Sequence, residues 1–126
     1  MRKSILVGAV LASLSAHADT TTLVPINNVA QFFDAYDNAP NASARSALEL
    51  MIIGAEQAIM SANAQASQAG QPLFCEPMSA SLSTAQVIQL LRIGYKEDKR
   101  YAVVPVGFGL LQAYDAAFPC QGQKAP

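Results

Sequence analysis

The sequence predicts an all-α fold, a small helical bundle of four to five helices with one disulfide. Three observations lead to this fold class. Apolar residues recur at helical spacing in four segments after residue 26, and no alternating apolar–polar stretch of convincing strand length follows that point. The connections between these segments are short, as they are in helical bundles. The chain has two cysteines, and each lies beside a phenylalanine and close to a proline.

The start of the chain has the layout of a cleavable signal peptide. Two basic residues precede a short apolar run, residues 5–14, and the tripeptide Ala-His-Ala that ends at Ala18 matches an A-x-A cleavage site. The apolar run is about half as long as a membrane-spanning helix requires. We therefore expect residues 1–18 to be removed on export, and residues 19–126 to form one soluble helical domain with no membrane partner.

The first helix is expected within residues 27–40. Asn27 or Asn28 can cap its N-terminus, and Pro40 ends it. The apolar residues fall at the i, i+3, i+4, i+7 spacing of one helix face. That face carries Val29, Phe32, Phe33 and Tyr36.

A long second helix is expected over residues 42–68, a stretch without proline that is rich in strong helix formers. Asn41 or Ser43 can cap its N-terminus, and Gly70 with the proline two residues later ends it. Its many small residues, with Gly54 at mid-helix, should let a neighbouring helix approach closely. The face expected to point inward carries Leu48, Met51, Ile52, Ala55, Ile59 and Ala62.

The third helix should begin at a capping box, in which the Ser83 side chain caps the helix and Gln86 reaches back. An extended turn precedes it, because Pro77 disfavours helical backbone at Glu76. The helix is expected to continue to about Asp98. Its inward residues should be Val87, Leu90, Leu91 and Tyr95.

The last helix is expected within residues 101–118, after a charged break at residues 96–100. Because proline is tolerated only in the first turn of a helix, regular helix should start close to Pro105, and Pro119 should end it. The residues expected to face inward are Val106, Leu110, Ala113, Tyr114 and Ala117.

Two large apolar residues of the last helix, Phe108 and Leu111, point away from that inward face. They are candidates for the seam of a homodimer. The alternative is that the helix lies between two neighbours and buries both faces.

The composition excludes several function classes. The only histidine, His17, lies in the signal peptide, which excludes histidine-dependent hydrolysis and histidine-containing metal sites in the exported chain. Removing the signal peptide leaves six of the eight basic residues against nine acidic ones, a net charge of 6 − 9 = −3. Six dispersed cations do not form a phosphate-binding footprint. We therefore predict no enzyme, no catalytic residue, no metal, no cofactor and no nucleic-acid partner.

One pair of carboxylates, Glu49 and Glu56, lies on one face of the long helix, seven residues apart. Two carboxylates act as an acid–base pair only across a cleft, with one of them in an apolar pocket. We favour the alternative, a solvated helix face.

The two cysteines of an exported chain most simply form a disulfide. A bridge between Cys75 and Cys120 would close a loop of 45 residues and stabilise the fold by about 4 kcal/mol in the chain-entropy treatment. The alternative is a reactive thiol at either position, which lacks a histidine to help form the thiolate. We predict the structural bridge, which ties the turn before the third helix to the end of the fourth.

The densest charge cluster is Lys96-Glu97-Asp98-Lys99-Arg100, bordered by Tyr95 and Tyr101. An exposed loop of mixed charge with bordering tyrosines suits insertion into a polar cleft of a partner protein. We therefore predict these seven residues as a partner-binding segment. The alternative is a solvated connection between two helices.

Four motifs occur in order along the exported chain: a long helix containing Ile53-Gly54-Ala55, a Phe-Cys-x-Pro turn at residues 74–77, a capped helix with Thr84, Gln86 and Val87, and a last helix that ends in Ala-Phe-Pro-Cys at residues 117–120. This order resembles the Rap/Tai immunity proteins, the small periplasmic antitoxins of type VI secretion systems. The resemblance covers nearly all of the exported chain. The paired cysteine motifs are its most specific part.

The resemblance implies a periplasmic protein that usually forms a homodimer and occludes the active site of a peptidoglycan amidase effector delivered by sister cells. Many members of that family carry a second cysteine pair between the first helix and the start of the second. Here the corresponding regions, residues 33–36 and 47–48, contain no cysteine. The Gly-Tyr pair often found before the glycine of the second helix is replaced by Leu50-Met51.

A second function of a different class also fits the chain. The small helical acid-stress chaperones of the periplasm carry one disulfide and loosen at low pH to expose apolar surface. The chain is similar to them in size, helicity and cysteine count, so a holdase chaperone is the alternative to an inhibitor.

Overall fold

The computed structural model describes residues 25–77 and 81–122. Within them the chain forms four α-helices, one 3-10 helix and no β-strand. The helices are α1 (Val29–Asp37), α2 (Ala42–Gln68), α3 (Thr84–Glu97) and α4 (Val106–Ala117), and the 3-10 helix η1 (Lys99–Val103) joins α3 to α4. The all-α fold class is confirmed. The expected signal peptide lies outside the described residues.

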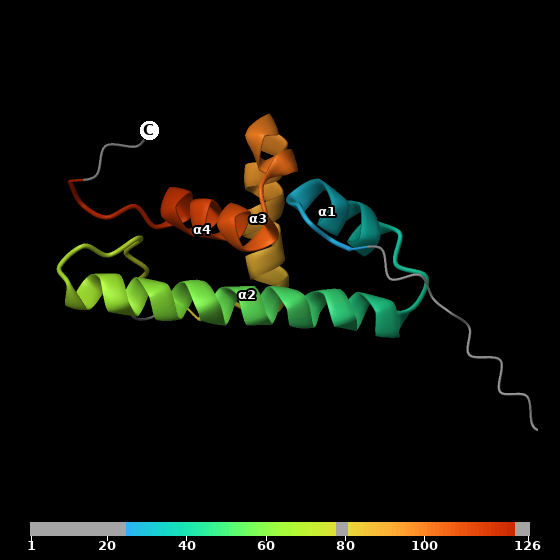
Figure 1. Ribbon diagram of the computed structural model, residues 1–126, viewed down its shortest axis with the longest axis horizontal. Coiled ribbons are helices and arrows are strands. Elements are labelled where there is room, and N and C mark those ends of the chain that lie inside the picture. The colour runs from blue at the N-terminus through green and yellow to red at the C-terminus, as the bar shows by residue number, and fades with distance from the viewer. Residues whose placement is uncertain (1–24, 78–80, 123–126) are drawn as a thin grey trace, which may run out of the picture.

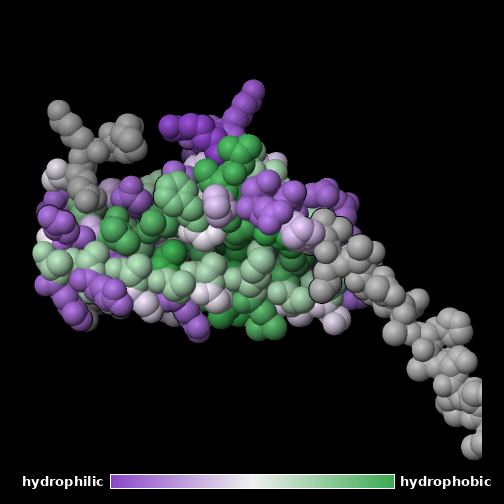
Figure 2. Space-filling view, viewed as in Figure 1, coloured by the Kyte–Doolittle hydropathy of each residue, from purple (hydrophilic) through white to green (hydrophobic). Residues whose placement is uncertain are grey.

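The long helix α2 forms one layer of the bundle, and the other helices pack on one side of it (Figure 1). In that view α1 and α4 lie above the two halves of α2, and α3 passes behind them, crossing the direction of α2. The most extensive helix–helix contacts are those of α4 with α3 and with α2. Figure 2 shows that apolar side chains gather along the seam between α2 and the helices above it.

Helix α1 begins at the predicted cap, and its predicted apolar face is buried. The side chain of Asn28 caps it by accepting a hydrogen bond from the Gln31 amide at 2.9 Å. Val29, Phe32 and Phe33 are buried, and Tyr36 is partly buried against them. The helix ends at Asp37, before the proline that was expected to end it, and the Asn38 side chain donates a further hydrogen bond to the carbonyl of Asp34 at 2.8 Å.

Helix α2 is capped by Asn41, whose side chain accepts from the Ala44 amide at 2.8 Å. Its buried residues are Ile52 and Ile59. Two expectations for this helix are wrong. Ala62 is exposed, and Gly54 also faces solvent with no atom near the position of a β-carbon. A helix of 27 residues is about 40 Å long, longer than the elements that pack on it, so much of its surface stays in water.

Helix α3 starts at the predicted capping box, with Ser83 and Gln86 each bonding the other's backbone. Its core face is shifted toward Ile88, which is buried although the sequence pattern did not single it out. Leu90 and Tyr95 are only partly buried. The shift arises because α3 contacts α2 and α4 at once, so its buried stripe is wider than a single apolar row.

The predicted charged break is not one loop. Lys96 and Glu97 complete the last turn of α3, Asp98 caps η1, and the remaining charged residues lie within η1. Helix α4 then begins directly after Pro105, as predicted.

Helix α4 buries Val106, Gly109, Leu110, Ala113 and Tyr114. Ala117, which was expected to face inward, is exposed because the helix ends there and the chain turns away toward the disulfide. Gly109 permits a close approach, since a β-carbon there would lie 2.7 Å from Cγ2 of Val29 and 3.2 Å from Cδ1 of Leu91.

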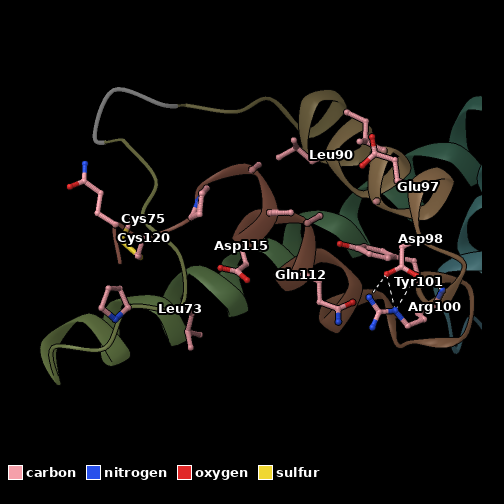
Figure 3. A pocket seen from close by; sticks show the side chains of 18 of the residues that line it. Leu73, Cys75, Leu90, Glu97, Asp98, Arg100, Tyr101, Gln112, Asp115 and Cys120 are labelled. Atoms are coloured by element: carbon pink, nitrogen blue, oxygen red, sulfur yellow. Dashed lines mark hydrogen bonds and ion pairs between the residues drawn. A yellow bond between two sulfur atoms is a disulfide. The ribbon is translucent and has the colours of Figure 1, made fainter. Parts of the chain in front are cut away.

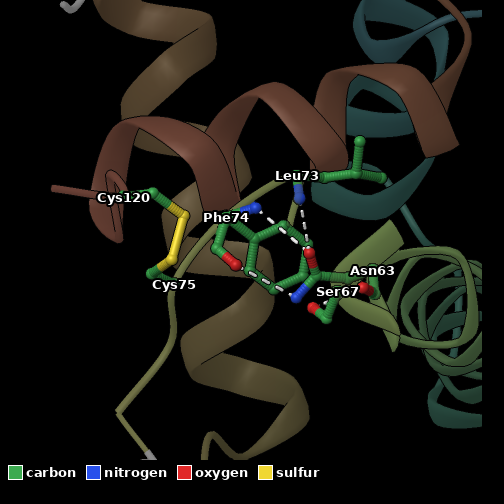
Figure 4. Close-up of a disulfide and its surroundings, with 6 residues drawn as sticks. All are labelled: Asn63, Ser67, Leu73, Phe74, Cys75 and Cys120. Atoms are coloured by element: carbon green, nitrogen blue, oxygen red, sulfur yellow. Dashed lines mark hydrogen bonds between the residues drawn. A yellow bond between two sulfur atoms is a disulfide. The ribbon is translucent and has the colours of Figure 1, made fainter. Parts of the chain in front are cut away.

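The predicted disulfide is present. Cys75 and Cys120 are bonded, with their α-carbons 4.8 Å apart, across 45 residues of sequence (Figure 4). Beside the bridge, the Cys75 amide donates a hydrogen bond to the Phe118 carbonyl at 2.8 Å. The turn before α3 and the end of α4 are therefore joined covalently and by a backbone hydrogen bond.

A second anchor holds the same turn to α2. The side chain of Asn63 accepts hydrogen bonds from the amides of Leu73 and Phe74 at 2.7 and 3.1 Å and donates one to the Phe74 carbonyl at 3.1 Å (Figure 4). The Phe74 ring is 1% exposed and packs against Tyr114, with ring centroids 5.0 Å apart. The turn thus contributes the Phe74 ring to the core.

Candidate functional site

The predicted partner-binding segment, residues 95–101, forms the corner between α3 and α4. Lys96 and Glu97 are exposed on the last turn of α3, and Lys99 and Arg100 are exposed on η1. The four side chains that can reach a partner directly therefore carry three positive charges and one negative charge.

The acidic residue at the centre of this segment, Asp98, organises η1. Its carboxylate accepts hydrogen bonds from the Arg100 amide at 2.9 Å and from the Arg100 guanidinium, whose Nη2 lies 2.7 Å away. These bonds hold the pKa of the Asp98 carboxyl below its ordinary value. The corner is thus a folded turn with a fixed backbone course.

The prediction that Tyr101 is an exposed contact residue is wrong. It is 7% exposed and belongs to the core. Burial raises the pKa of its hydroxyl, and the negative charges of Asp98, Asp115 and Glu97 raise it further. Its ring lies against the backbone of Gly94, so Tyr101 positions η1 on α3.

The other bordering tyrosine also faces the fold. Tyr95 is partly buried and stacks on Phe33 of α1, with ring centroids 5.3 Å apart. On the same side of α3, Arg92 forms a two-pronged ion pair with Asp37, at 2.7 and 2.9 Å, and lies over the Phe33 ring. These contacts fix α1 to α3 and do not involve the exposed charged residues of the corner.

The two candidates for a dimer seam differ in exposure. Phe108 is 51% exposed. Leu111 is partly buried and packs against the core, which corrects the expectation that it points outward. For Leu111 the alternative interpretation holds, in which α4 lies between two neighbours and buries a second face.

A broad open groove adjoins the corner. Helices α3 and α4 and the turn before α3 form its walls, the disulfide lies at one end, and Asp98, Arg100 and Tyr101 lie at the other (Figure 3). Its apolar lining includes Leu73 from the turn and Leu90 and Ile93 from α3. Glu97, Asp98 and Asp115 supply its negative charges, and Arg100 supplies its positive charge.

Both glutamates of the predicted solvated face instead accept hydrogen bonds from buried or partly buried tyrosines. Tyr36 donates to Glu49 at 3.1 Å, and Tyr114 donates to Glu56 at 2.6 Å. Burial raises the pKa of the Tyr114 hydroxyl, as do this hydrogen bond and the negative charge of Glu76. Each carboxylate therefore ties α2 to a neighbouring helix, and the two do not form an acid–base pair.

Glu76, beside the disulfide, is the basis of a pH-dependent prediction. Burial raises the pKa of its carboxyl, and the charge of Glu56 raises it further. A carboxyl with a raised pKa in the folded state destabilises the fold when it is charged. This cost is present at neutral pH and disappears as the pH falls through the raised pKa toward the ordinary value of 4.5.

We expect Glu76→Gln to raise the melting temperature at pH 7 by about 2–4 °C and to leave it unchanged at pH 4. Thermal unfolding followed by circular dichroism at both pH values measures the difference. Glu97→Gln is the matched control, because Glu97 is exposed. A gain at pH 4 as large as at pH 7 would contradict the electrostatic explanation.

Sequence reasoning missed Asn63 and two groove residues of α4, Gln112 and Asp115. Asn63 bonds the chain ten and eleven residues further on, so no short motif marks it. Gln112 and Asp115 are four and seven residues after Phe108, so they share the helix face that was predicted to be exposed. A search for polar residues at that helical spacing could have found them.

Within the described residues, no group of three or more His, Cys, Asp or Glu side chains is arranged to hold a metal ion. None of the helices in residues 25–77 and 81–122 combines the length and the apolarity needed to cross a membrane. Comparison with protein-family models, with curated proteins and with solved structures gave no match to this chain.

Proposed function

We propose that this protein is an immunity protein of the Rap/Tai kind, which binds a type VI secreted peptidoglycan amidase effector in the periplasm and occludes its active site. The observation that carries the proposal is the disulfide. The two sequence motifs that resemble that family, around Cys75 and Cys120, meet as the halves of one bridge. Such a bridge persists in an oxidising compartment, which agrees with export by a cleavable signal peptide.

The proposed mechanism is steric occlusion by a surface that is already ordered. Each mobile side chain that must be fixed at an interface costs about 0.5–1.5 kcal/mol. The corner between α3 and α4 avoids part of this cost, because Asp98 holds Arg100 and Tyr101 holds η1 against α3. The exposed charges of Lys96 and Lys99 can then meet the polar rim of a catalytic cleft.

A homodimer belongs to the same proposal. Phe108 is the exposed aromatic residue that would lie in its seam. Leu111 is left out of the seam because it packs against the core of its own chain.

The direct test is protection of a bacterial host that expresses, directed to the periplasm, a peptidoglycan amidase effector that is retained by this protein in a pull-down. We expect the amidase alone to lyse the cells and co-expression of the full chain to restore growth. Deleting residues 2–18 should abolish protection, because the protein would stay on the wrong side of the membrane. Inhibition of the purified amidase at a one-to-one ratio checks that binding is responsible.

Two results would contradict the proposal. One is an amidase that stays fully active in molar excess of the purified protein. The other is turnover of a cell-wall substrate by the protein alone.

A pH titration in the presence of a hydrophobic dye distinguishes the holdase alternative from the inhibitor. A holdase should bind the dye once the pH is lowered to about 4, where acid-induced partly folded states expose apolar surface. For the inhibitor we expect no increase at pH 4. Hydrogen bonds from Arg92 hold the pKa of the Asp37 carboxyl below its ordinary value of 3.8, so the stability that this ion pair adds is kept at pH 4 and is lost only at lower pH.

A further inference from the structure

The groove between α3, α4 and the turn before α3 has an exposed apolar lining that the occlusion mechanism does not use. Ile93 is 42% exposed and Leu73 is 37% exposed, and both line the groove from different elements. Exposed large apolar residues that share one concave surface are typical of binding sites. The other large exposed apolar residues of the described chain, Leu50, Val103 and Phe108, are not part of the groove lining.

The groove is also acidic. Glu97 from α3 and Asp115 from α4 line it, and neither forms an ion pair among the described residues. Asp98 is paired with Arg100. All three carboxylates act on the Tyr101 hydroxyl, so their charges converge near the end of the groove although they come from different positions in the chain.

Lys96, which is close in sequence, does not neutralise the negative charge of the groove carboxylates. Lys96 is not part of the groove lining, and its positive charge acts on Asp37 of α1. The groove therefore offers two exposed apolar side chains, and two carboxylates that have no cationic partner in the described structure.

We propose that the groove binds a segment of the partner protein in which apolar side chains are flanked by lysine or arginine. The apolar side chains would cover Leu73 and Ile93, and the cations would pair with Glu97 and Asp115. The identity of the partner rests on the proposed function, and the chemistry of the segment rests on the groove. A second copy of this chain is disfavoured as the occupant, because Phe108, the exposed residue proposed for the homodimer seam, is not part of the groove lining.

The probe is a synthetic peptide of alternating Leu and Lys pairs, with a matched peptide in which Glu replaces Lys. Both are titrated into the isotope-labelled chain purified from the periplasm. We expect the Lys peptide to shift the amide signals of Ile93, Gly94 and Asp115 and the Glu peptide to leave them unchanged. Raising the salt concentration should weaken binding, because exposed charge pairs are screened.

Two variants and two matched controls test the contacts. Asp115→Lys should weaken binding of the Lys peptide about fivefold or more, and Ile93→Ser about tenfold. Asp34→Lys reverses an exposed acidic residue on α1, and Leu50→Ser removes a large apolar residue that is 66% exposed on α2. Both controls should bind the peptide as the unmodified chain does.

The outcomes separate this inference from the proposed function. Peptide binding with shifts outside the groove, or equal losses in the controls, overturns the groove as the site. If size-exclusion chromatography shows a dimer that Ile93→Ser dissociates and the Lys peptide does not bind, the occupant is a second copy and the proposal is wrong.

The last comparison is between the groove variants and the unmodified chain as inhibitors of the amidase. If Ile93→Ser and Asp115→Lys inhibit it as well as the unmodified chain does, the groove inference fails and the immunity function stands. If the Lys peptide binds the groove but no amidase is inhibited, the groove inference stands and the immunity function fails.

Discussion

Replacing Cys75 and Cys120 together by alanine is expected to lower the free energy of unfolding by about 4 kcal/mol. The bridge closes a loop of 45 residues, and opening it restores that much chain entropy to the unfolded state. For a domain of this size the loss corresponds to a fall in melting temperature of about 15 °C or more. Alanine is chosen because Cys120 is buried, at 9% exposure, and a serine hydroxyl there would need a new partner.

The effect should be concentrated at one end of the bundle. Without the bridge, the turn keeps three hydrogen bonds to Asn63 and the buried ring of Phe74. The residues after α4 keep fewer contacts, namely the hydrogen bonds of Phe118 to Cys75 and Tyr114 and the packing of its partly buried ring on Tyr114. Hydrogen exchange should therefore show faster exchange at the end of α4 than in α1. Under the proposed immunity function, the variant should also protect cells less well from the amidase, because the disulfide end of the groove is no longer fixed.

The reducing agent dithiothreitol provides the matched control for this prediction. The unmodified chain, once fully reduced, should melt at the same temperature as the double alanine variant. A double variant that melts within a few degrees of the oxidised protein and protects as well would show that the bridge is not what stabilises this fold.

The elements of this fold could be predicted because their signals are local. The cap at Asn28, the capping box of Ser83 with Gln86, and the start of α4 at Pro105 each depend on residues within four positions of one another. The disulfide could also be predicted, since the two cysteines of the chain have one possible intrachain pairing.

The burial of single residues was less predictable, because it depends on which helix lies opposite. Helical spacing placed Ala62 and Ala117 inside, but both side chains are exposed. Tyr101 follows five charged residues in sequence and still belongs to the core. Its ring fits there because Gly94, in the last turn of α3, has no side chain to occupy that space. The candidate groove was not predictable either, since its walls come from segments about 20 residues apart that meet only in the folded chain.

The dependence of Tyr101 on Gly94 gives the second large prediction, a difference in sign between two glycine-to-alanine changes. In a helix interior, alanine is favoured over glycine by about 1 kcal/mol. Gly54→Ala on α2 meets no atom within 4 Å and should raise the free energy of unfolding by that amount. Gly94→Ala on α3 places a β-carbon 2.5 Å from Cε1 and 2.6 Å from Cζ of Tyr101, which is an overpacked contact.

Overpacking a core costs about 1–3 kcal/mol, so Gly94→Ala should destabilise the protein despite its better helix propensity. The ring of Tyr101 cannot move aside freely, because it is only 7% exposed and η1 is short and held by Asp98. Urea unfolding of both variants measures the two changes in free energy. Tyr101→Leu supplies the control: in that background the ring is gone, and Gly94→Ala should cost less than it does in the unmodified chain. An equal cost in both backgrounds would mean that Gly94 is required for a reason other than the close approach of Tyr101, and η1 would then owe its position on α3 to its other contacts.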